Sequence, residues 1–173
     1  MTSIYLVRHA RSQGNDAGRF QGRMDTLLAP VGLEQAQYLG KRFASLPVAA
    51  VYSSPLRRAR QTAAAIAAPH HLEVQVEPDL IEIDIGDFEN RTFDEVRRLY
   101  PRELEAFDAT PHLFTAPKNG ESILDVYTRM VRAIGDIAKR HPNQTVAVVS
   151  HGCAIRCYLC FAKAYPLERL GET

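Results

Sequence analysis

The amino-acid sequence predicts one α/β domain over residues 1–173, built on a mostly parallel central sheet. Short apolar runs alternate along the chain with longer segments of helical periodicity, the pattern of strands joined by crossover helices. The composition agrees, because 46% of the residues are hydrophobic and 24% are charged, as in an ordinary globular domain. No internal repeat, low-complexity tract or linker divides the chain.

The first half of the chain begins with a predicted strand at 3–7, which ends at Arg8 and His9. Residues 10–28 are rich in Gly, Asn, Asp and Gln, and we expect a long functional loop there. Apolar residues recur on one face of a helix that starts at Pro30 and is broken at Pro47. After a second strand at 49–52, Ser53 or Ser54 is expected to cap a helix over 56–68, with Pro55 at its first position.

The second half of the chain has a predicted strand at 73–76 and then alternating apolar and acidic residues over 80–88. A helical pattern over 93–107 is interrupted at Pro101, and 110–120 is a loop. An amphipathic helix over 122–140 leads into the clearest buried strand, 145–149. A last helix is predicted for 153–165.

Polar side chains follow the ends of the first and the last predicted strand. Arg8 and His9 come after the one, Ser150 and His151 after the other. In open α/β sheets ligands bind at the carboxyl ends of the strands, so two histidines from opposite ends of the sequence are expected at one binding site. Arginine beside them would hold phosphate or carboxylate through paired hydrogen bonds.

Two further groups of charged residues have both a functional and an ordinary interpretation. Arg57, Arg58 and Arg60 fall in the first turns of a helix that follows a strand end, where they form either an anion site or a solvated basic face. Glu82 and Asp84 alternate with isoleucines and would point to one side of an extended segment. Either one of these carboxyl groups donates a proton to a leaving group in the site, or both form the solvent-exposed face of an edge strand.

Several alternative chemistries do not fit the spacing of the residues. None of the three cysteines has an arginine six positions later, as a cysteine phosphatase requires, and the glycine-rich phosphate loop and the nucleophile elbow are both absent. Cys153, Cys157 and Cys160 have the spacing of an iron–sulfur motif, but they fall on one face of a predicted helix, which favours a role in the core. We therefore expect no metal.

The motifs resemble those of the histidine phosphatase (phosphoglycerate mutase-like) superfamily. Residues 6–12 read Leu-Val-Arg-His-Ala-Arg-Ser, with Asn15 following, and residues 54–63 read Ser-Pro-Leu-Arg-Arg-Ala-Arg-Gln-Thr-Ala. Residues 80–89 resemble the family's Leu-x-Glu-x-x-x-Gly-x-Trp-Glu element. Gly-Glu-Ser at 120–122 and Val-Val-Ser-His-Gly at 148–152 complete the set in the family's order.

The resemblance implies a three-layer α/β/α sandwich and a phosphomonoester hydrolase that uses neither metal nor cofactor. It implies that His9 becomes transiently phosphorylated and that Glu82 is the proton donor. The other implied site residues bind the phosphoryl group or line the mouth; they are Arg8, Asn15, Gln21, Gly22, Arg58, His151 and Gly152. A short cap is expected at about 91–117. Four residues of the long loop and of this cap either bind a second charged group of the substrate or lie on the surface; they are Arg19, Arg23, Arg91 and His112.

This chain departs from the family's motifs at a few positions. Ala10 and Arg11 replace a glycine and a Glu or Gln, and Phe88 and Asn90 replace a tryptophan and a glycine. None of these changes removes a group that the resemblance makes catalytic. Arg11 favours an anionic substrate.

The expected activity is that of a phosphatase acting on a small phosphorylated metabolite. A cofactor-dependent phosphoglycerate mutase, a phosphoprotein phosphatase and a non-catalytic phospho-ligand binder are the alternatives. The short cap favours hydrolysis, because it should admit water. The net charge of +1, from 21 basic and 20 acidic residues, argues against nucleic acid and acidic membranes as partners. A monomer or homodimer in the cytoplasm is expected, with no signal peptide.

Overall fold

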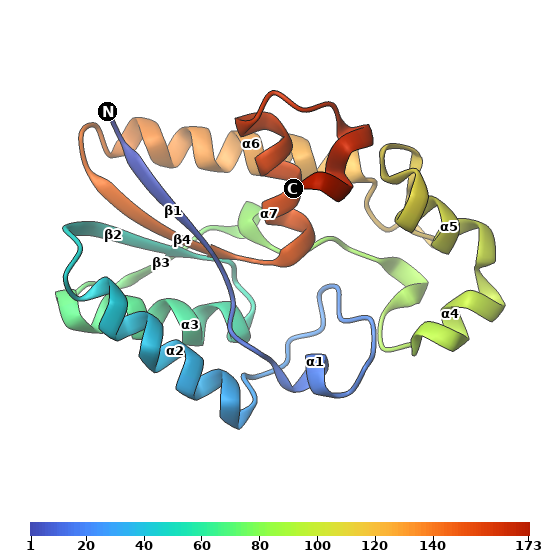
Figure 1. The fold of residues 1–173 in the computed structure, drawn as a ribbon, viewed down its shortest axis with the longest axis horizontal. Helices are drawn as coiled ribbons and strands as arrows, with labels where there is room; N and C mark the ends of the chain where they lie inside the picture. Colours follow the sequence, from blue (N-terminus) through green and yellow to red (C-terminus); the bar gives the residue numbers. More distant parts are fainter.

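The computed structural model describes residues 1–173 and contains a four-stranded, wholly parallel sheet (Figure 1). The strands are β1 (Ser3–Arg8), β2 (Val48–Ser53), β3 (Val74–Val76) and β4 (Thr145–Ser150), in the order β1-β4-β2-β3. The first and last strands of the sequence are therefore neighbours, with Arg8 paired to Ser150. All four predicted strands are confirmed to within one or two residues at each end.

Helices cover both faces of the sheet, which gives the three layers that the family resemblance implied. Helices α2 (Pro30–Phe43) and α3 (Arg57–Ala67) lie on one face, and α6 (Ile123–Arg140) and α7 (Gly152–Ala162) lie on the other (Figure 1). The strands divide their residues between the two layers by simple alternation. In β4, for example, Val146 and Val148 pack toward α6 and α7, whereas Ala147 and Val149 pack toward α3.

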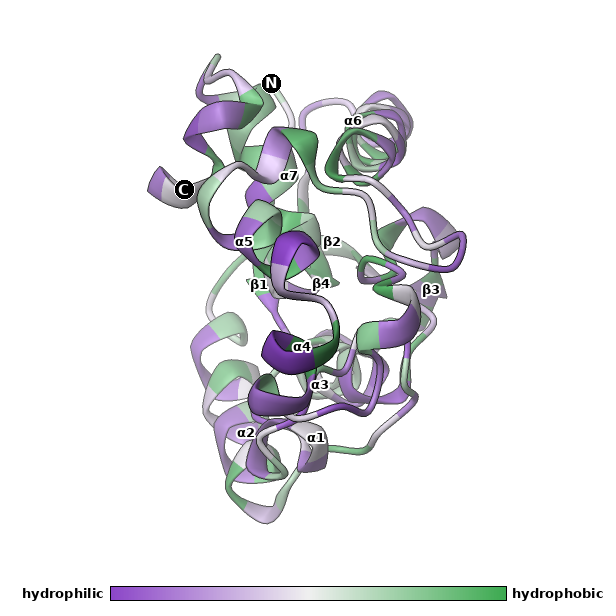
Figure 2. Ribbon diagram, turned by 90° about the vertical axis from the view of Figure 1, so that its right-hand side faces the viewer, coloured by the Kyte–Doolittle hydropathy of each residue, from purple (hydrophilic) through white to green (hydrophobic).

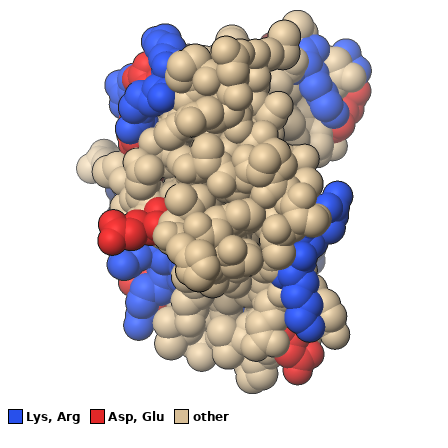
Figure 3. Space-filling model, turned by 90° about the vertical axis from the view of Figure 1, so that its left-hand side faces the viewer, with Lys and Arg blue, Asp and Glu red and all other residues tan.

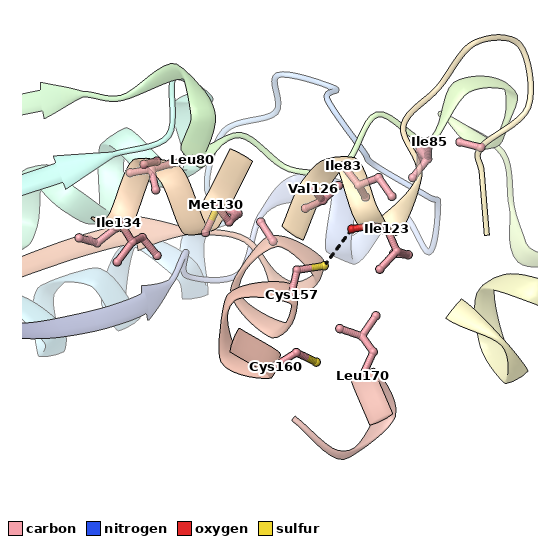
Figure 4. Packing of buried hydrophobic residues seen from close by; sticks show 14 of the residues in the cluster. Leu80, Ile83, Ile85, Ile123, Val126, Met130, Ile134, Cys157, Cys160 and Leu170 are labelled. Atoms are coloured by element: carbon pink, nitrogen blue, oxygen red, sulfur yellow. Dashed lines mark hydrogen bonds between the residues drawn. The ribbon is translucent and has the colours of Figure 1, made fainter. Parts of the chain in front are cut away.

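The larger core lies between the sheet, α6, α7 and the segment that follows β3. Met130, Ile134 and Cys157 are fully buried there, and the Cys157 thiol points to the carbonyl of Ile123 (Figure 4). Seen from the side of α4 and α5, the strands form a hydrophobic centre behind more hydrophilic helices (Figure 2). The predicted core role of the cysteine face is confirmed for Cys157 and Cys160, which are both 0% exposed.

The segment predicted as a cap contains α4 (Phe93–Leu99), α5 (Pro101–Ala109) and a 3-10 turn at Pro111–Leu113. Pro101 begins α5, as expected from its lack of a backbone N–H. On the opposite side of the molecule, charged residues of both signs lie at the margins of a largely uncharged face (Figure 3). No helix of the structure is both long and apolar enough to cross a membrane.

Two local predictions were wrong. The loop over 10–28 contains one helical turn, α1 (Gln13–Asp16), because Ser12 and Asn15 form a reciprocal capping box. The N-cap of α3 is Leu56 rather than a serine, so Pro55 precedes the helix; the Ser54 hydroxyl instead contacts His151.

Residues 80–88 were open to two interpretations, and the edge strand is the one that does not apply. The segment is no strand of the sheet, and its backbone groups bond to Arg129 and Glu121.

The contact between α2 and α3 gives a stability prediction. A Cβ at Gly40 would lie 2.5 Å from the carbonyl oxygen of Ala65, whereas a Cβ at Gly135 in α6 has no atom within 4 Å. Gly40→Ala should therefore lower the free energy of unfolding by about 1–3 kcal/mol through overpacking. Gly135→Ala should raise it by about 0.5–1 kcal/mol, since alanine loses less entropy in a helix. Urea unfolding measures both, and equal effects would contradict the packing described.

Candidate active site

The candidate site lies where three neighbouring strands end. The parallel ladder continues past the strands, because the His9 N–H donates to the carbonyl of Ser150 at 3.0 Å and the Ser54 N–H donates to that of Val149 at 3.0 Å. These bonds fix the backbone of the residues that leave β1, β4 and β2. The imidazole rings of His9 and His151 consequently lie with their centroids 5.0 Å apart. The predicted convergence of the two histidines is confirmed.

The tautomer of His9 follows from its hydrogen bonds. Nδ1 lies 2.7 Å from the carbonyl oxygen of Ala10, and a carbonyl only accepts, so Nδ1 carries the hydrogen. Nε2 therefore carries the ring's lone pair, which accepts a hydrogen bond from the Nε of Arg58 at 3.2 Å. His9 is 8% exposed, and its ring is held at both nitrogens. Nε2 is thus the ring nitrogen that could act as a nucleophile, and His9 and Arg58 line the same pocket.

The surroundings of His9 keep its ring neutral. Burial lowers the pKa of His9 from the usual 6.5 to about 4; the hydrogen bond to Ala10 opposes this change, and the positive charges of Arg58 and Arg8 add to it. A protonated imidazole has no lone pair with which to attack. The lowered pKa therefore keeps the lone pair of His9 unprotonated across the neutral pH range.

Arg58 is the most deeply buried charge of the site, at 1% exposure. It lies in the first turn of α3, and its Nη groups donate to the carbonyls of Gly22, at 2.9 Å, and Met24. Burial lowers the pKa of Arg58, while the negative charge of Glu82 opposes that change. The loop between α1 and α2 thus holds the guanidinium against His9. Backbone carbonyls are neutral, so they fix its position without neutralising its charge.

The ring of His151, next to that of His9, has one nitrogen without a hydrogen-bond partner. Its Nε2 lies 2.7 Å from the Oγ of Ser54, and that hydroxyl already accepts the Leu56 N–H at 3.3 Å. The Ser54 hydroxyl has no other acceptor for its own hydrogen, so we infer that it donates to Nε2, which leaves the hydrogen of His151 on Nδ1. Nδ1 is buried and has no hydrogen-bond partner in the protein. A neutral ring with a free N–H donor suits an oxygen of an incoming phosphoryl group, and burial, together with Arg58 and His9, lowers the pKa of His151.

The loop side of the pocket is preorganised by hydroxyl and amide groups. The side-chain oxygen of Asn15 accepts from the Ser12 N–H at 2.9 Å, so its amide nitrogen is left for the pocket that Asn15 lines. Gln21 lines the same pocket, with its oxygen held by Ser12. Gly22 has φ +48°, and a Cβ there would lie 2.5 Å from Ile85. Glycine is therefore required at this turn.

The pocket has a volume of about 440 Å³ and is lined from both ends of the chain. Arg8 projects into it beside Gly152, whose Cβ position lies 3.6 Å from the Arg8 guanidinium. Arg8 forms none of the ion pairs of the structure, so its charge is available to a ligand. Together with Arg58 it places two guanidinium groups around Nε2 of His9, which suits a dianion.

Glu82 lines the same pocket, and its carboxylate lies at the N-terminus of α7. Its carboxylate accepts the backbone N–H groups of Cys153, at 3.2 Å, and Ala154, at 3.1 Å. A helix N-terminus is a favourable place for a carboxylate, because its N–H groups lack helical partners. The side chain is thus held at a fixed position in the pocket that also contains His9.

A buried ion pair fixes the segment that carries Glu82. Arg129 donates to both carboxylate oxygens of Glu121, at 2.9 and 3.0 Å, and to the carbonyls of Asp79 and Ile81. Glu121 in turn accepts the N–H of Asp84 at 3.0 Å. Burial is the largest single influence on Glu121 and raises its pKa, but the hydrogen bonds from Arg129 and the Asp84 N–H, together with the charges of Arg129 and Arg23, leave the pKa lowered. The pair therefore holds the backbone on both sides of Glu82.

Every residue that the sequence proposed for the core of the site lies in or against the pocket. All line it except His151, whose ring centroid lies 5.0 Å from that of His9. The residues that were expected either to bind a second charge or to lie on the surface do not all line the pocket. Arg19 lines the pocket, whereas Arg23, Arg91 and His112 do not; Arg23 pairs with Asp84 and Glu121. Arg57 pairs with Asp25 on the surface, so only Arg58 of the arginine cluster reaches the site.

Part of the pocket wall consists of residues that were not predicted from the sequence. Phe107 and Asp108 come from the cap, Arg156 from the second turn of α7, and Leu170 and Gly171 from the C-terminal segment. Arg156 was detectable, because it lies four residues after Gly152 and so on the same helix face. The other four carry no local signal. The structure brings together no group of three or more His, Cys, Asp or Glu side chains that could hold a metal ion.

The fold and the site define an α/β protein with two neighbouring histidines and several arginines around a pocket at the carboxyl edge of a parallel sheet. Residues 4–173 match the model of the histidine phosphatase superfamily (branch 1). The chain belongs to this superfamily, and its activity class is that of a phosphatase.

Individual relatives agree with this assignment. The chain is 39% identical to phosphoserine phosphatase 1 of Hydrogenobacter thermophilus, over 92% of this chain and 75% of that protein. It is 37% identical to a metal-independent phosphoserine phosphatase of Arabidopsis thaliana, over 98% and 73% of the two chains. The structure of Bacillus stearothermophilus YhfR matches with a TM-score of 0.95 and 35% identity, over 100% and 85% of the two chains. Other relatives are named probable phosphoglycerate mutases.

The lowered pKa of His9 predicts how stability changes with pH. Below pH 6.5 the unfolded chain binds a proton on this ring and the folded chain does not, so stability falls as the pH drops from 6.5 toward 4. The full effect of the shift is at most about 3 kcal/mol. Replacement of the ring in His9→Asn should reduce the loss of stability between pH 7 and pH 4.5, measured by urea unfolding. The same loss in both proteins would contradict the assigned neutral ring.

Proposed function

We propose that this protein hydrolyses a small phosphomonoester without metal, through a phosphohistidine on Nε2 of His9. The observation that carries the proposal is the fixed tautomer of His9, whose lone pair points to Arg58 inside a cationic pocket. A neutral nucleophile and preorganised positive charge are what phosphoryl transfer requires of a protein. The relatives named phosphoserine phosphatases support a small phosphorylated substrate.

In the first step, Nε2 of His9 attacks phosphorus and the bond from phosphorus to the ester oxygen breaks. The departing oxygen takes a proton from the carboxyl group of Glu82 and leaves as the alcohol. Arg8, Arg58, the amide nitrogen of Asn15 and Nδ1 of His151 donate to the phosphoryl oxygens. Gln21, Gly22 and Gly152 complete the wall around this group.

In the second step, water attacks the phosphohistidine from the side on which the alcohol has left. Glu82, now a carboxylate, takes one proton from this water, and the bond between phosphorus and Nε2 breaks. Inorganic phosphate and neutral His9 result, with Glu82 protonated again. The Ala10 carbonyl serves both steps, because it stabilises the Nδ1–H of the ring while Nε2 carries phosphorus.

A mutase is the second candidate, because some relatives bear that name. The cap segment contributes only Phe107, Asp108 and Pro111 to the pocket wall, from α5 and the turn that follows it, and we infer that such a cap admits water to the intermediate. We place the protein in the cytoplasm, where its three free cysteines would stay reduced, as a monomer or homodimer.

Phosphate release from p-nitrophenyl phosphate, phosphoserine and 3-phosphoglycerate should persist in EDTA. It should fall by at least about a hundredfold in His9→Ala, because the nucleophile is gone. Colorimetric phosphate assays measure both effects. Transfer of phosphate between the glycerate positions faster than its release to water would contradict the hydrolase and establish the mutase.

The Glu121–Arg129 pair predicts a dependence on the leaving group. Glu121→Gln should loosen the segment around Glu82 and lower kcat/KM for phosphoserine on the order of tenfold. The value for p-nitrophenyl phosphate should fall much less, because nitrophenolate leaves without a proton. Arg132→Gln is the matched control, since it breaks an exposed pair on the same helix α6. An equal fall for both substrates would show that the pair supports only the fold.

A further inference from the structure

Three charged residues that line the pocket have no part in the proposed chemistry, namely Arg19, Asp108 and Arg156. Asp108 lies near the end of α5 and Arg156 lies in α7, and both line the pocket that contains His9. We propose that these residues read an ammonium group and a carboxylate on the substrate, so that the site selects phosphomonoesters of an α-amino acid. The proposal rests on the phosphatase function proposed above.

The carboxylate of Asp108 is unfavourable for the binding of a phosphate ester that carries no positive charge. A carboxylate at the mouth of such a pocket repels an incoming dianion, and Asp108 forms no ion pair that would neutralise it. Glu82 is the only other acidic residue of the wall, and the mechanism uses it as the proton donor. A cationic group on the substrate reverses the effect of Asp108 from repulsion to attraction. The side chain therefore favours an ester that carries an ammonium group.

Arg156 supplies the complementary site for an anion. One of its Nη groups donates to the carbonyl of Leu170 at 2.7 Å, which holds the guanidinium against the C-terminal segment and leaves other N–H groups for the pocket. Four residues of helix separate it from Gly152, a rise of about 6 Å along α7. That distance suits a carboxylate a few bonds away from the phosphoryl group. A planar fork of N–H donors is also the form that binds carboxylates best.

Apolar residues of the pocket wall limit the size of the alcohol part of the phosphate ester. Phe20, Phe107 and Pro111 are apolar lining residues, and the whole pocket has a volume of about 440 Å³. Phe107 packs against Phe114 with ring centroids 4.9 Å apart, so this wall is anchored in the core rather than free. The remaining outer cation, Arg19, already faces Glu95 at 3.7 Å. Asp108 and Arg156 are thus the charges available to a small zwitterionic alcohol.

Three esters separate the two contacts. Phosphoserine has both groups, 3-phosphoglycerate has a hydroxyl in place of the ammonium, and phosphoethanolamine lacks the carboxylate. The purified full chain should give a kcat/KM for phosphoserine at least about tenfold above either analogue, because each analogue leaves one charged residue unpaired. p-Nitrophenyl phosphate reports separately whether the chain is a phosphatase.

Single substitutions test whether Asp108 binds the ammonium group of the substrate and Arg156 its carboxylate. Asp108→Asn should lower the ratio of phosphoserine to 3-phosphoglycerate about fivefold or more, and Arg156→Gln should do the same to the ratio of phosphoserine to phosphoethanolamine. Glu105→Gln is the matched control, because it removes one negative charge from the same helix α5 outside the pocket. It should leave both ratios unchanged.

The outcomes distinguish this proposal from the function on which it rests. Hydrolysis of p-nitrophenyl phosphate with no preference among the three esters, or with ratios that Asp108→Asn and Arg156→Gln do not move, overturns the assignment of amino-acid esters and leaves the phosphatase intact. No phosphate release from any of the four compounds by folded protein overturns both. Ratios that Glu105→Gln moves as much as Asp108→Asn show an effect of overall charge and also overturn the assignment.

Discussion

The hydrogen bond from Nδ1 of His9 to the carbonyl of Ala10 is the interaction on which the rest of the site depends. It determines that Nε2 holds the lone pair, and so it determines where phosphorus has to be placed. The remaining groups then have defined positions relative to one atom. Arg58 donates to that atom directly, and His151 lies beside the same ring. Without this bond the ring could present either nitrogen, and the surrounding cations would have no fixed target.

The site holds two guanidinium groups, those of Arg8 and Arg58, that form no ion pair in the absence of a ligand. Arg58 is held by neutral carbonyls, Arg8 forms no ion pair, and the buried Nδ1 of His151 has no partner. Burial and these charges together keep both histidines neutral. A bound phosphoryl dianion would supply the missing negative charge and the missing acceptor. The unpaired groups are therefore understandable as preorganisation, in which the fold bears a cost that phosphate binding offsets.

The sequence was sufficient to predict the sheet and the centre of the site, for a physical reason. Strands buried on both faces are continuous apolar runs, and the residues that follow them must meet at one edge, so His9 and His151 could be placed without coordinates. The resemblance to the histidine phosphatases added Glu82 and Arg58. The alternation over residues 80–88 left a proton donor and an edge strand as alternatives, and the structure has no strand there; Arg129 and Glu121 hold that segment instead. Asp108 and Gly171 reach the pocket only through tertiary packing, which no local pattern encodes.

The central claim is that Nε2 of His9 carries the phosphoryl group, and its most direct test is to observe the intermediate. Glu82→Gln should trap it with p-nitrophenyl phosphate, since that leaving group needs no proton whereas the attacking water needs a base. The trapped protein, labelled with ¹⁵N in its histidines, would be examined by ³¹P and ¹⁵N NMR and by peptide mass spectrometry. The account predicts one acid-labile phosphate on Nε2 of His9. Phosphate on Nδ1 or on another residue, or turnover with no phosphorylated protein, would contradict it.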